Sequence, residues 1–269
     1  QLLDSLRAAG FNRLSLGMQS ASEQVLAVLE RRHTPGRAVA AVWEAEAAGF
    51  SNINLDLIYG TPGETMAQWQ DSLDAALAVR PTHLSAYALT LEPHTALARR
   101  IAAAVVPPVD EDDLADKYLV AEKTLVAAGL TNYEVSNWSL PGYECRHNMA
   151  YWLGEDWWGA GPGAHSHVAG QRWWNARSPR RWAELLADGH YPSEGAEVLD
   201  ATAQHTERVL LRLRLASGLP LRWLPDTAEV AELVAGYLKN GLVSVGDNLV
   251  LTPPGRLLAD RIALELLST

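Results

Sequence analysis

The chain has 269 residues, of which 48% are hydrophobic, and this is enough for one large globular domain or two ordinary ones. Its formal net charge of −10 argues against nucleic acid as a partner, because phosphate binding relies on clustered Lys and Arg. No apolar run reaches the ~18 residues of a membrane span, and the single cysteine, Cys145, excludes an internal disulfide and fits a reducing, cytoplasmic location.

The first fifty residues predict a helix, a strand and two further helices. The first helix covers residues 2–9, and the alternation from Arg13 to Met18 is typical of a strand. Ser20 or Ser22 can cap the next helix, and another helix is predicted over residues 36–48. The helix after the serines ends in basic residues, which suit a helix C-terminus, namely Arg31, Arg32 and His33.

The stretch from Asn52 to Gly63 combines a strand, an acidic side chain and a sharp turn. Aliphatic and polar residues alternate along it with the period of a strand, and Gly60 and Pro62 end the strand. Asp56 lies among the aliphatic residues, where an unpaired carboxylate costs several kcal/mol, roughly. Asp56 is therefore either structurally paired or in contact with a ligand, and the residue pattern leaves both open.

Residues 1–100 predict strands that alternate with helices. A helix with apolar residues at helical spacing follows the central strand and ends before Pro81, and a third strand is predicted from His83 to Leu91. The resulting order, β-α-α-β-α-β, is typical of a parallel sheet that is closed or nearly closed into a barrel. Three strands cannot close a barrel, so we expect the missing strands upstream of Gln1.

Residues 101–200 are expected to form a linking α+β region. An acidic helix begins at Asp110, a strand is predicted from Asn132 to Trp138, and seven of the ten tryptophans fall within 45 residues. Such a density of rings suits a planar ligand or a partner surface, but aromatic residues that cover one end of the barrel would give the same pattern. The seven are Trp138, Trp152, Trp157, Trp158, Trp173, Trp174 and Trp182.

Residues 201–269 predict a winged-helix-like order of helix, helix, hairpin and helix. From His205 onward, seven basic and seven acidic residues cancel, which argues against DNA binding. The predicted elements are a helix over Val209–Leu215, a helix with a capping box of Asp226 and Glu229, a hairpin around Gly246 to Asn248, and a helix from Pro254.

Most clusters of polar residues predict no particular reaction. The glycine-rich run 159–163 does not lead into a helix, so it is not expected to bind phosphate. His165 and His167 would share one face of a strand and are a nonspecific candidate pair of metal ligands. Five other histidines have no companions and are expected at the surface or at caps, namely His33, His83, His94, His190 and His205.

The segment from Cys145 to Trp152 is the most distinctive cluster. Histidine can ligate haem iron, and His147 is accompanied by Tyr151 and Trp152, which offer ring faces to a porphyrin. Arg146 could pair with a propionate. This segment predicts a tetrapyrrole site.

Two segments, residues 10–20 and 54–63, resemble characteristic barrel strands of the radical S-adenosylmethionine (SAM) family, in its coproporphyrinogen-dehydrogenase-like branch. The resemblance covers nearly the whole chain and implies the C-terminal part of a partial (β/α)6 barrel, followed by an α+β region and a small winged-helix-like domain. It also implies that Gln19, Arg31 and Asp56, which are 12 and 25 residues apart, contact SAM. The Gln19 amide suits a polar edge of the ligand, the Arg31 guanidinium suits its carboxylate, and the Asp56 carboxylate suits its ribose hydroxyls.

The run His-Asn-x-x-Tyr-Trp is similar to the signature of the haem chaperone subgroup of that family. It implies haem as cargo, a haem-receiving protein as partner, and haem contacts at His147, Asn148, Tyr151 and Trp152, with His147 as a candidate iron ligand. The signature is not expected in the alternative, an oxygen-independent coproporphyrinogen III oxidase of porphyrin biosynthesis. A third reading is an interaction module without a cofactor.

One family feature has no counterpart in this sequence. The family's Cys-x-x-x-Cys-x-x-Cys motif holds a [4Fe–4S] cluster that binds SAM, whereas this chain has one cysteine. We therefore expect the cluster ligands upstream of Gln1 and no radical chemistry from this chain alone.

Overall fold

The structure, a computed structural model, describes residues 1–31 and 36–268. The chain forms two compact units, residues 1–144 and residues 145–269. The expected boundaries at residues 100 and 200 lie inside these units, and the three-part division stays a prediction. Arg32 and His33, which were predicted at a helix end, lie outside the described residues.

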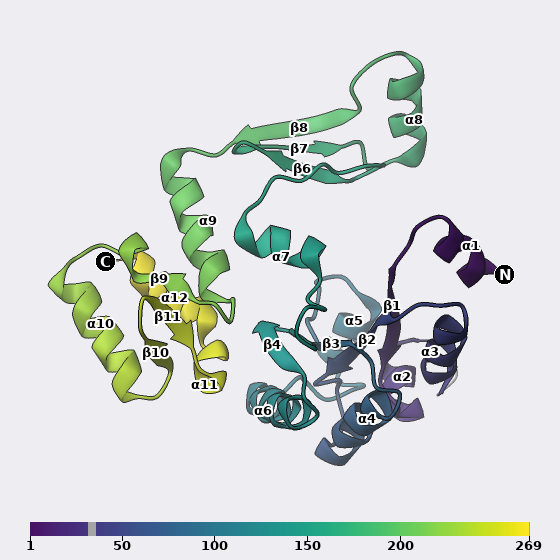
Figure 1. Cartoon of the computed structure of the whole chain (residues 1–269), viewed down its shortest axis with the longest axis horizontal. Coiled ribbons are helices and arrows are strands. Elements are labelled where there is room, and N and C mark those ends of the chain that lie inside the picture. The colour runs from purple at the N-terminus through teal and green to yellow at the C-terminus, as the bar shows by residue number, and fades with distance from the viewer. Residues whose placement is uncertain (32–35, 269) are drawn as a thin grey trace. The chain divides into compact units, whose positions relative to one another are not determined.

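The first unit contains one five-stranded sheet, made of β1 (Arg13–Gln19), β2 (Asn52–Tyr59), β3 (His83–Ala88), β4 (Thr131–Glu134) and β5 (Asn137–Ser139). Its strand order is β1-β2-β3-β5-β4, and Figure 1 labels β1, β2, β3 and β4 of this sheet. The first three strands are parallel, as the sequence predicts, and β5 and β4 continue the sheet in antiparallel fashion. Leu16, Leu55 and Leu84 are direct neighbours across the three parallel strands, so the apolar positions share one face.

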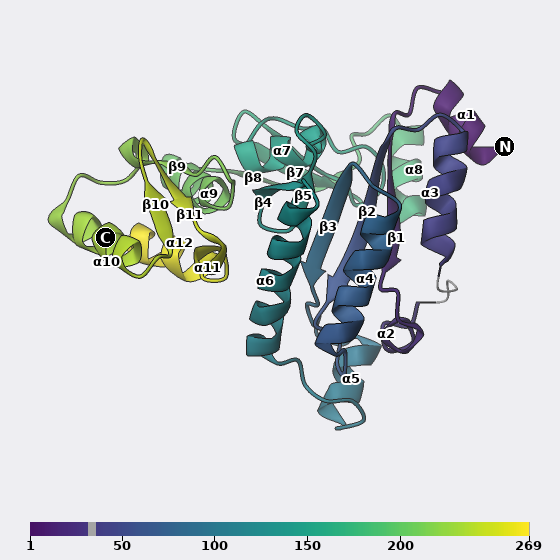
Figure 2. The same ribbon diagram turned by 60° about the horizontal axis from the view of Figure 1, so that its bottom comes forward.

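Helices cover the apolar face of this sheet. Figure 2 shows α3 (Arg37–Ala47), α4 (Met66–Ala78) and α6 (Glu111–Ala127) lying along the strands. Leu55 and Leu84 are fully buried beneath them. The indole of Trp69 on α4 is also fully buried, and its Nε1 donates a hydrogen bond of 2.9 Å to the Lys117 carbonyl on α6. The other helices of the unit are α1 (Leu2–Ala8), α2 (Glu23–Val28) and α5 (Ala96–Ala102).

The predicted single strand from Asn132 to Trp138 is wrong. The segment forms two antiparallel strands, β4 and β5, which a tight turn joins. The Glu134 carboxylate stabilises the turn by accepting hydrogen bonds from the Ser136 N–H, at 3.2 Å, and from the Asn137 amide. Because side chains rather than Gly or Pro make this turn, the pattern gave no sign of it.

The second unit begins with α7 (Arg146–Leu153) and an antiparallel sheet of β6 (His165–Val168), β7 (Gln171–Asn175) and β8 (Ser193–Val198). α8 (Pro179–Ala187) lies between β7 and β8 in the chain, and α9 (Ala201–Leu213) follows β8. α7 packs against α9. The glycine-rich run 159–163 leads into β6 and not into a helix, as predicted.

The end of the second unit has a separate hydrophobic core around Leu213, Leu219 and Leu249, which are fully buried. Its strand order is β10-β11-β9, and the predicted hairpin around Gly246 to Asn248 joins β10 to β11. The winged-helix-like description stays a prediction at this level of detail. The elements are β9 (Leu219–Pro220), η1 (Leu221–Trp223), α10 (Ala228–Lys239), β10 (Val243–Val245), β11 (Asn248–Leu251), α11 (Pro253–Arg256) and α12 (Ala259–Leu267).

Three predicted helix boundaries are corrected in this region. α9 begins at Ala201 rather than Val209, because the Asp200 carboxylate caps it by accepting the Ala203 N–H at 2.8 Å. α10 is capped by Thr227 and not by Asp226. The predicted helix from Pro254 is divided into α11 and α12. None of the helices within residues 1–31 and 36–268 combines the length and hydrophobicity that a transmembrane helix needs.

Candidate functional site

The face of the sheet opposite the helices is polar. Alternation along the parallel strands places Ser15 of β1, Asn54 and Asp56 of β2, and His83 and Ser85 of β3 on this face. Each of these side chains takes part in a hydrogen bond with another member of the group. The polar positions of three separate strands therefore form one connected network.

Asn54 lies at the centre of this network and is 2% exposed. Its amide nitrogen contacts Ser15 Oγ at 2.6 Å and Asp56 Oδ1 at 2.7 Å, while its Oδ1 lies 2.6 Å from His83 Nδ1. Ser15 Oγ in turn donates to Asp56 Oδ2 at 2.9 Å. Both oxygens of the Asp56 carboxylate therefore accept hydrogen bonds from neighbouring side chains. Asp56 is structurally paired, which is one of the two possibilities that the sequence left open.

His83 was expected at the surface or at a cap, and this expectation is wrong. The ring is 1% exposed and lies between Asn54 Oδ1 and the Tyr133 hydroxyl, which is 2.8 Å from His83 Nε2. Burial lowers the pKa of His83 to about 3, and the charge of Arg13 adds to this effect. Since an amide oxygen only accepts, the neutral ring carries its proton on Nδ1 and accepts from Tyr133 at Nε2.

Gln19, Arg31 and Asp56 line a single cavity of about 460 Å³ at the carboxyl ends of β1, β2 and β3. Asp56 is half-buried and Arg31 is exposed, so charged groups of opposite sign face the same space. Ile58 and Tyr87 supply apolar wall. The structure thus brings together the three residues that the resemblance pointed to, and their role as SAM contacts stays a prediction.

The backbone around Gln19 is adapted to this position. Gln19 has a φ of 63°, in the left-handed region, and the pairing of β1 with β2 shifts register between Gly17 and Gln19. The Gln19 amide folds back over Gly17, where a Cβ would lie 2.7 Å from Gln19 Nε2. Glycine at position 17 therefore leaves the room that the Gln19 amide occupies.

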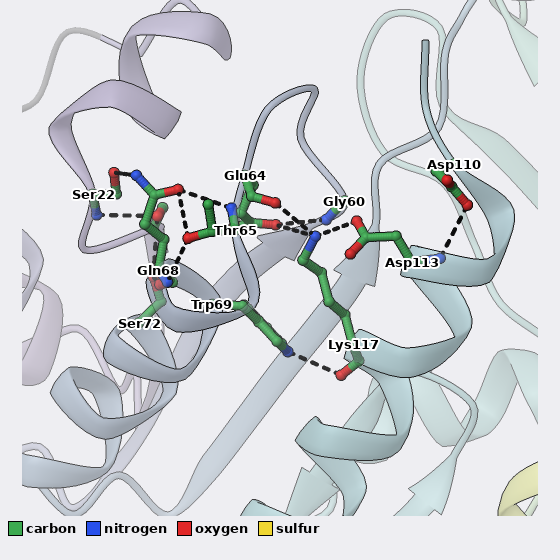
Figure 3. Close-up of polar contacts among 11 residues, drawn as sticks. Ser22, Gly60, Glu64, Thr65, Gln68, Trp69, Ser72, Asp110, Asp113 and Lys117 are labelled. Carbon is green, nitrogen blue, oxygen red and sulfur yellow. Dashed lines mark hydrogen bonds and ion pairs between the residues drawn. The ribbon is translucent and has the colours of Figure 1, made fainter. Parts of the chain in front are cut away.

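Arg31 follows α2, which hydrogen bonds attach to α4. The side chain of Gln68, at the start of α4, donates to Ser22 Oγ at 3.1 Å, and Ser22 caps α2 (Figure 3). The Arg31 N–H donates to the Leu26 carbonyl at 3.0 Å and closes the end of the helix. These contacts fix the point at which the Arg31 side chain leaves the backbone.

A buried charge cluster supports the turn that follows β2 (Figure 3). Lys117 on α6 is fully buried, and its Nζ contacts the Asp113 carboxylate and donates to the Glu64 carbonyl at 2.9 Å. Glu64 Oε2 accepts the Gly60 N–H at 2.7 Å. Gly60 is required here, since its φ is 77° and a Cβ would lie 1.9 Å from the Leu114 side chain.

Burial raises the pKa of Glu64 to about 7, although the hydrogen bond from Gly60 and the charge of Lys117 act in the opposite direction. One buried ammonium is shared between two carboxylates, and Asp113 is the one in direct contact with it. The excess acid, Glu64, therefore carries a proton over part of the range below pH 7. The cluster anchors the carboxyl end of β2, which carries Asp56.

Within the second unit, α7 carries the complete His-Asn-x-x-Tyr-Trp run. His147 and Tyr151 lie one turn apart and are exposed, with the Tyr151 hydroxyl 2.9 Å from His147 Nε2 and the two rings 4.8 Å apart. Tyr151 and Trp152 also line a cavity of about 310 Å³. The structure places Asn148 on the same helix.

Rings continue from α7 along the wall of this cavity. Tyr151 packs edge-on against Trp157 at 4.7 Å, and Trp157 packs against His167 at 4.8 Å. His165, which was paired with His167 in the sequence, stacks on Trp174 at 5.8 Å. The two histidines of β6 therefore contact different tryptophans.

The residues fit the cofactors of the resembled family unequally. The cavity at Gln19, Arg31 and Asp56 offers an amide, a cation and an anchored carboxylate, and this donor set suits SAM. An exposed imidazole beside ring faces on α7 suits haem. Cys145 cannot hold a [4Fe–4S] cluster by itself, and the described residues contain no group of three or more His, Cys, Asp or Glu side chains arranged for a metal ion.

The chain resembles known proteins in sequence. The model of the radical SAM superfamily matches residues 1–76. The chain is 52% identical over 264 residues to the heme chaperone HemW of Mycobacterium tuberculosis strain H37Rv, covering 98% of this chain and 67% of that protein. It is 37% identical over 219 residues to the heme chaperone HemW of Escherichia coli K12, covering 79% of this chain and 55% of that protein.

The fold also has a counterpart among solved structures. The coproporphyrinogen III oxidase HemN from Escherichia coli, described as a radical SAM enzyme, matches with a TM-score of 0.78 at 24% identity. The match covers 98% of this chain and 66% of that one, and at this identity it shows likeness of fold alone. The chain therefore spans about two thirds of the length of the Mycobacterium tuberculosis protein and of HemN, and 55% of the length of the Escherichia coli HemW.

Proposed function

The chain belongs to the HemW family of the radical SAM superfamily, and from this we propose that it binds haem and passes it to a haem-receiving protein. The observation that carries the proposal is the 52% identity, along 98% of the chain, to a protein named as a heme chaperone. A cytoplasmic location is part of the proposal, since a single cysteine is typical of a reducing compartment.

We propose that haem binds at α7, with His147 as the iron ligand. His147 and Tyr151 are exposed on one face of the helix, so a ligand can reach the imidazole without unfolding the core, and iron at Nε2 would displace only the contact with the Tyr151 hydroxyl. A planar macrocycle can lie against the Tyr151 and Trp152 rings. Asn148, which lies between His147 and these rings in the sequence, would provide a polar contact.

We further propose that the cavity at the carboxyl ends of β1, β2 and β3 binds SAM. Asp56 would accept hydrogen bonds from the ribose hydroxyls, Arg31 would pair with the ligand's carboxylate, and Gln19 would bond a polar edge. When bound, SAM together with a cluster would serve the regulation or the handover of haem. The residues of this chain do not fit a [4Fe–4S] cluster, so its thiolates would come from sequence beyond these 269 residues.

The alternative is an oxygen-independent coproporphyrinogen III oxidase. The fold is shared with such an enzyme, but a likeness at 24% identity does not carry the activity over. The haem-signature run on α7 favours the chaperone.

Haem transfer tests the proposal. The haem-loaded protein is mixed with an apo-haemoprotein, and the Soret absorbance of each is followed after rapid separation. The proposal predicts that haem moves to the acceptor. A second assay uses the full-length protein with its cluster loaded, together with SAM and a reductant under anaerobic conditions. The proposal predicts that this protein leaves coproporphyrinogen III unchanged. Decarboxylation of coproporphyrinogen III would favour the oxidase instead.

A further inference from the structure

The cavity beside Tyr151 and Trp152 has a distinct chemical character. Its volume is about 310 Å³, and α7, β6, β7 and α9 all contribute to its wall. The rings of Tyr151, Trp152 and Trp157 supply flat apolar surface. Opposite α7, the helix α9 contributes two arginines, Arg208 and Arg212.

These two arginines have no acidic partner among the described residues. Both guanidinium groups lie over the ring of Trp223, at 5.4 Å for Arg208 and 5.7 Å for Arg212. The third arginine of the wall, Arg172, differs, because it forms a two-pronged ion pair with Glu207.

Two like charges four residues apart on one helix repel each other, so Arg208 and Arg212 raise the free energy of the helix unless an anion lies near them. The stacking on Trp223 orients both groups without neutralising either of them. The wall therefore holds two oriented cations that form no ion pair with Asp156 or Glu207, the two acids of the same wall, and Glu207 is paired with Arg172.

The carboxylates of Asp156 and Glu207 also line this cavity, yet two N–H donors of its wall have no acceptor among the described residues. Trp152 Nε1 and Arg212 Nε are buried N–H donors that have no hydrogen-bond partner among the described residues. An unpaired buried donor costs about 1–3 kcal/mol. Within one cavity, apolar rings and two arginines that have no ion-pair partner in the described chain match a ligand that is flat and apolar in its body and carries carboxylates at its edge.

We propose that this cavity binds the carboxylate edge of a planar ligand through Arg208 and Arg212. The proposal rests on the proposed function, under which the ligand is haem and the carboxylates are its propionates. A cavity of about 310 Å³ is at the small end of the range for ligand sites. It would therefore hold only the propionate edge, and the remainder of the macrocycle would lie outside it, beside α7. His147 contacts Tyr151, which lines the cavity, and would hold the iron of a ligand bound there.

Esterified haem separates this proposal from general haem binding. Haem and haem dimethyl ester, whose propionates carry no charge, are titrated into the wild-type protein, Arg208→Gln, Arg212→Gln and the double variant. Each substitution is expected to weaken haem binding about tenfold and to leave the affinity for the ester unchanged. Arg181→Gln, an exposed arginine of α8 outside the cavity, is the matched control and is expected to bind both ligands as the wild type does.

The outcomes are distinct. If the variants bind haem as tightly as the wild type, the arginines do not bind the propionates and the inference is wrong. If the double variant loses haem and the ester equally, the arginines serve the fold and the inference is also wrong. If the wild type itself binds no haem, it is the proposed function that fails.

Discussion

The carboxylate of Asp56 is held in place by its own strand neighbours. Asn54 and Ser15 each bond one of its oxygens, and neutral His83 fixes the orientation of the Asn54 amide. A carboxylate oxygen has two lone pairs, so each oxygen can still accept a hydrogen bond from a ligand. Asp56 is therefore both structurally paired and available, and the two readings of the sequence do not exclude each other.

Removing this charge tests the SAM assignment. Asp56→Asn keeps the size of the side chain but replaces one acceptor by a donor, so the ribose hydroxyls would lose a charged partner. We expect SAM affinity to fall about tenfold or more in equilibrium dialysis. Asp71→Asn, at an exposed position of α4, is the control and should bind as the wild type does; equal affinity for Asp56→Asn would remove Asp56 from the site.

Glu64 predicts how stability depends on pH. Its pKa rises from 4.5 in the unfolded chain to about 7 in the folded one, so between these values only the folded state holds the proton. The contribution of Glu64 to the free energy of unfolding is therefore largest below about pH 4.5. It falls by about 3 kcal/mol in total as the pH rises through about 7.

Glu64→Gln checks this dependence in urea unfolding at pH 5, 6, 7 and 8. The amide keeps an acceptor for the Gly60 N–H and cannot ionise, so the decline between pH 5 and 8 should become shallower. The exposed Glu46→Gln should keep the wild-type slope. A wild-type slope in Glu64→Gln would show that another group causes the decline.

At the scale of elements, β2 and α4 organise the first unit. β2 supplies Asn54 and Asp56, while α4 begins with Thr65 and Gln68, whose side chains cap the helix reciprocally. Gln68 also bonds Ser22 on the cap of α2, and α2 leads to Arg31. The start of one helix thus helps to set the position of a residue in the candidate site.

Thr65→Ala removes one half of this capping box. The N–H of Gln68 loses its acceptor, and we expect the free energy of unfolding to fall by about 1 kcal/mol in urea titration. Thr202→Ala, at an exposed position inside α9, should change it by less than about 0.5 kcal/mol. A loss in Thr65→Ala as small as that of the control would mean that the cap contributes little.

The pattern of residues predicted the elements better than the contacts between them. Alternation and helical spacing gave β1, β2, α4 and the hairpin of β10 and β11, because burial on one face imposes those periods. The division of Asn132–Trp138 and the Thr227 cap escaped prediction, since individual side-chain hydrogen bonds decide them. His83 was missed for the same reason, although its place in phase with Ser85 on β3 was a usable signal.

At the scale of the whole chain, the two units hold different candidate sites. The first unit brings together Gln19, Arg31 and Asp56 in one cavity. Only the resemblance to a family predicts this, because residues so far apart in sequence show no local pattern. The second unit holds the α7 signature and the cavity with Arg208 and Arg212. The arginines carried no signal in the sequence, since their lack of acidic partners is a property of the folded chain.

Haem titration followed by Soret absorbance tests the central claim, that this chain carries haem at α7. The wild-type protein should bind one haem with the spectrum of a histidine-ligated iron. His147→Ala should lose that spectrum and bind at least about tenfold more weakly, while His165→Ala, an exposed histidine stacked on Trp174, should match the wild type. An unchanged spectrum and affinity in His147→Ala would contradict the account.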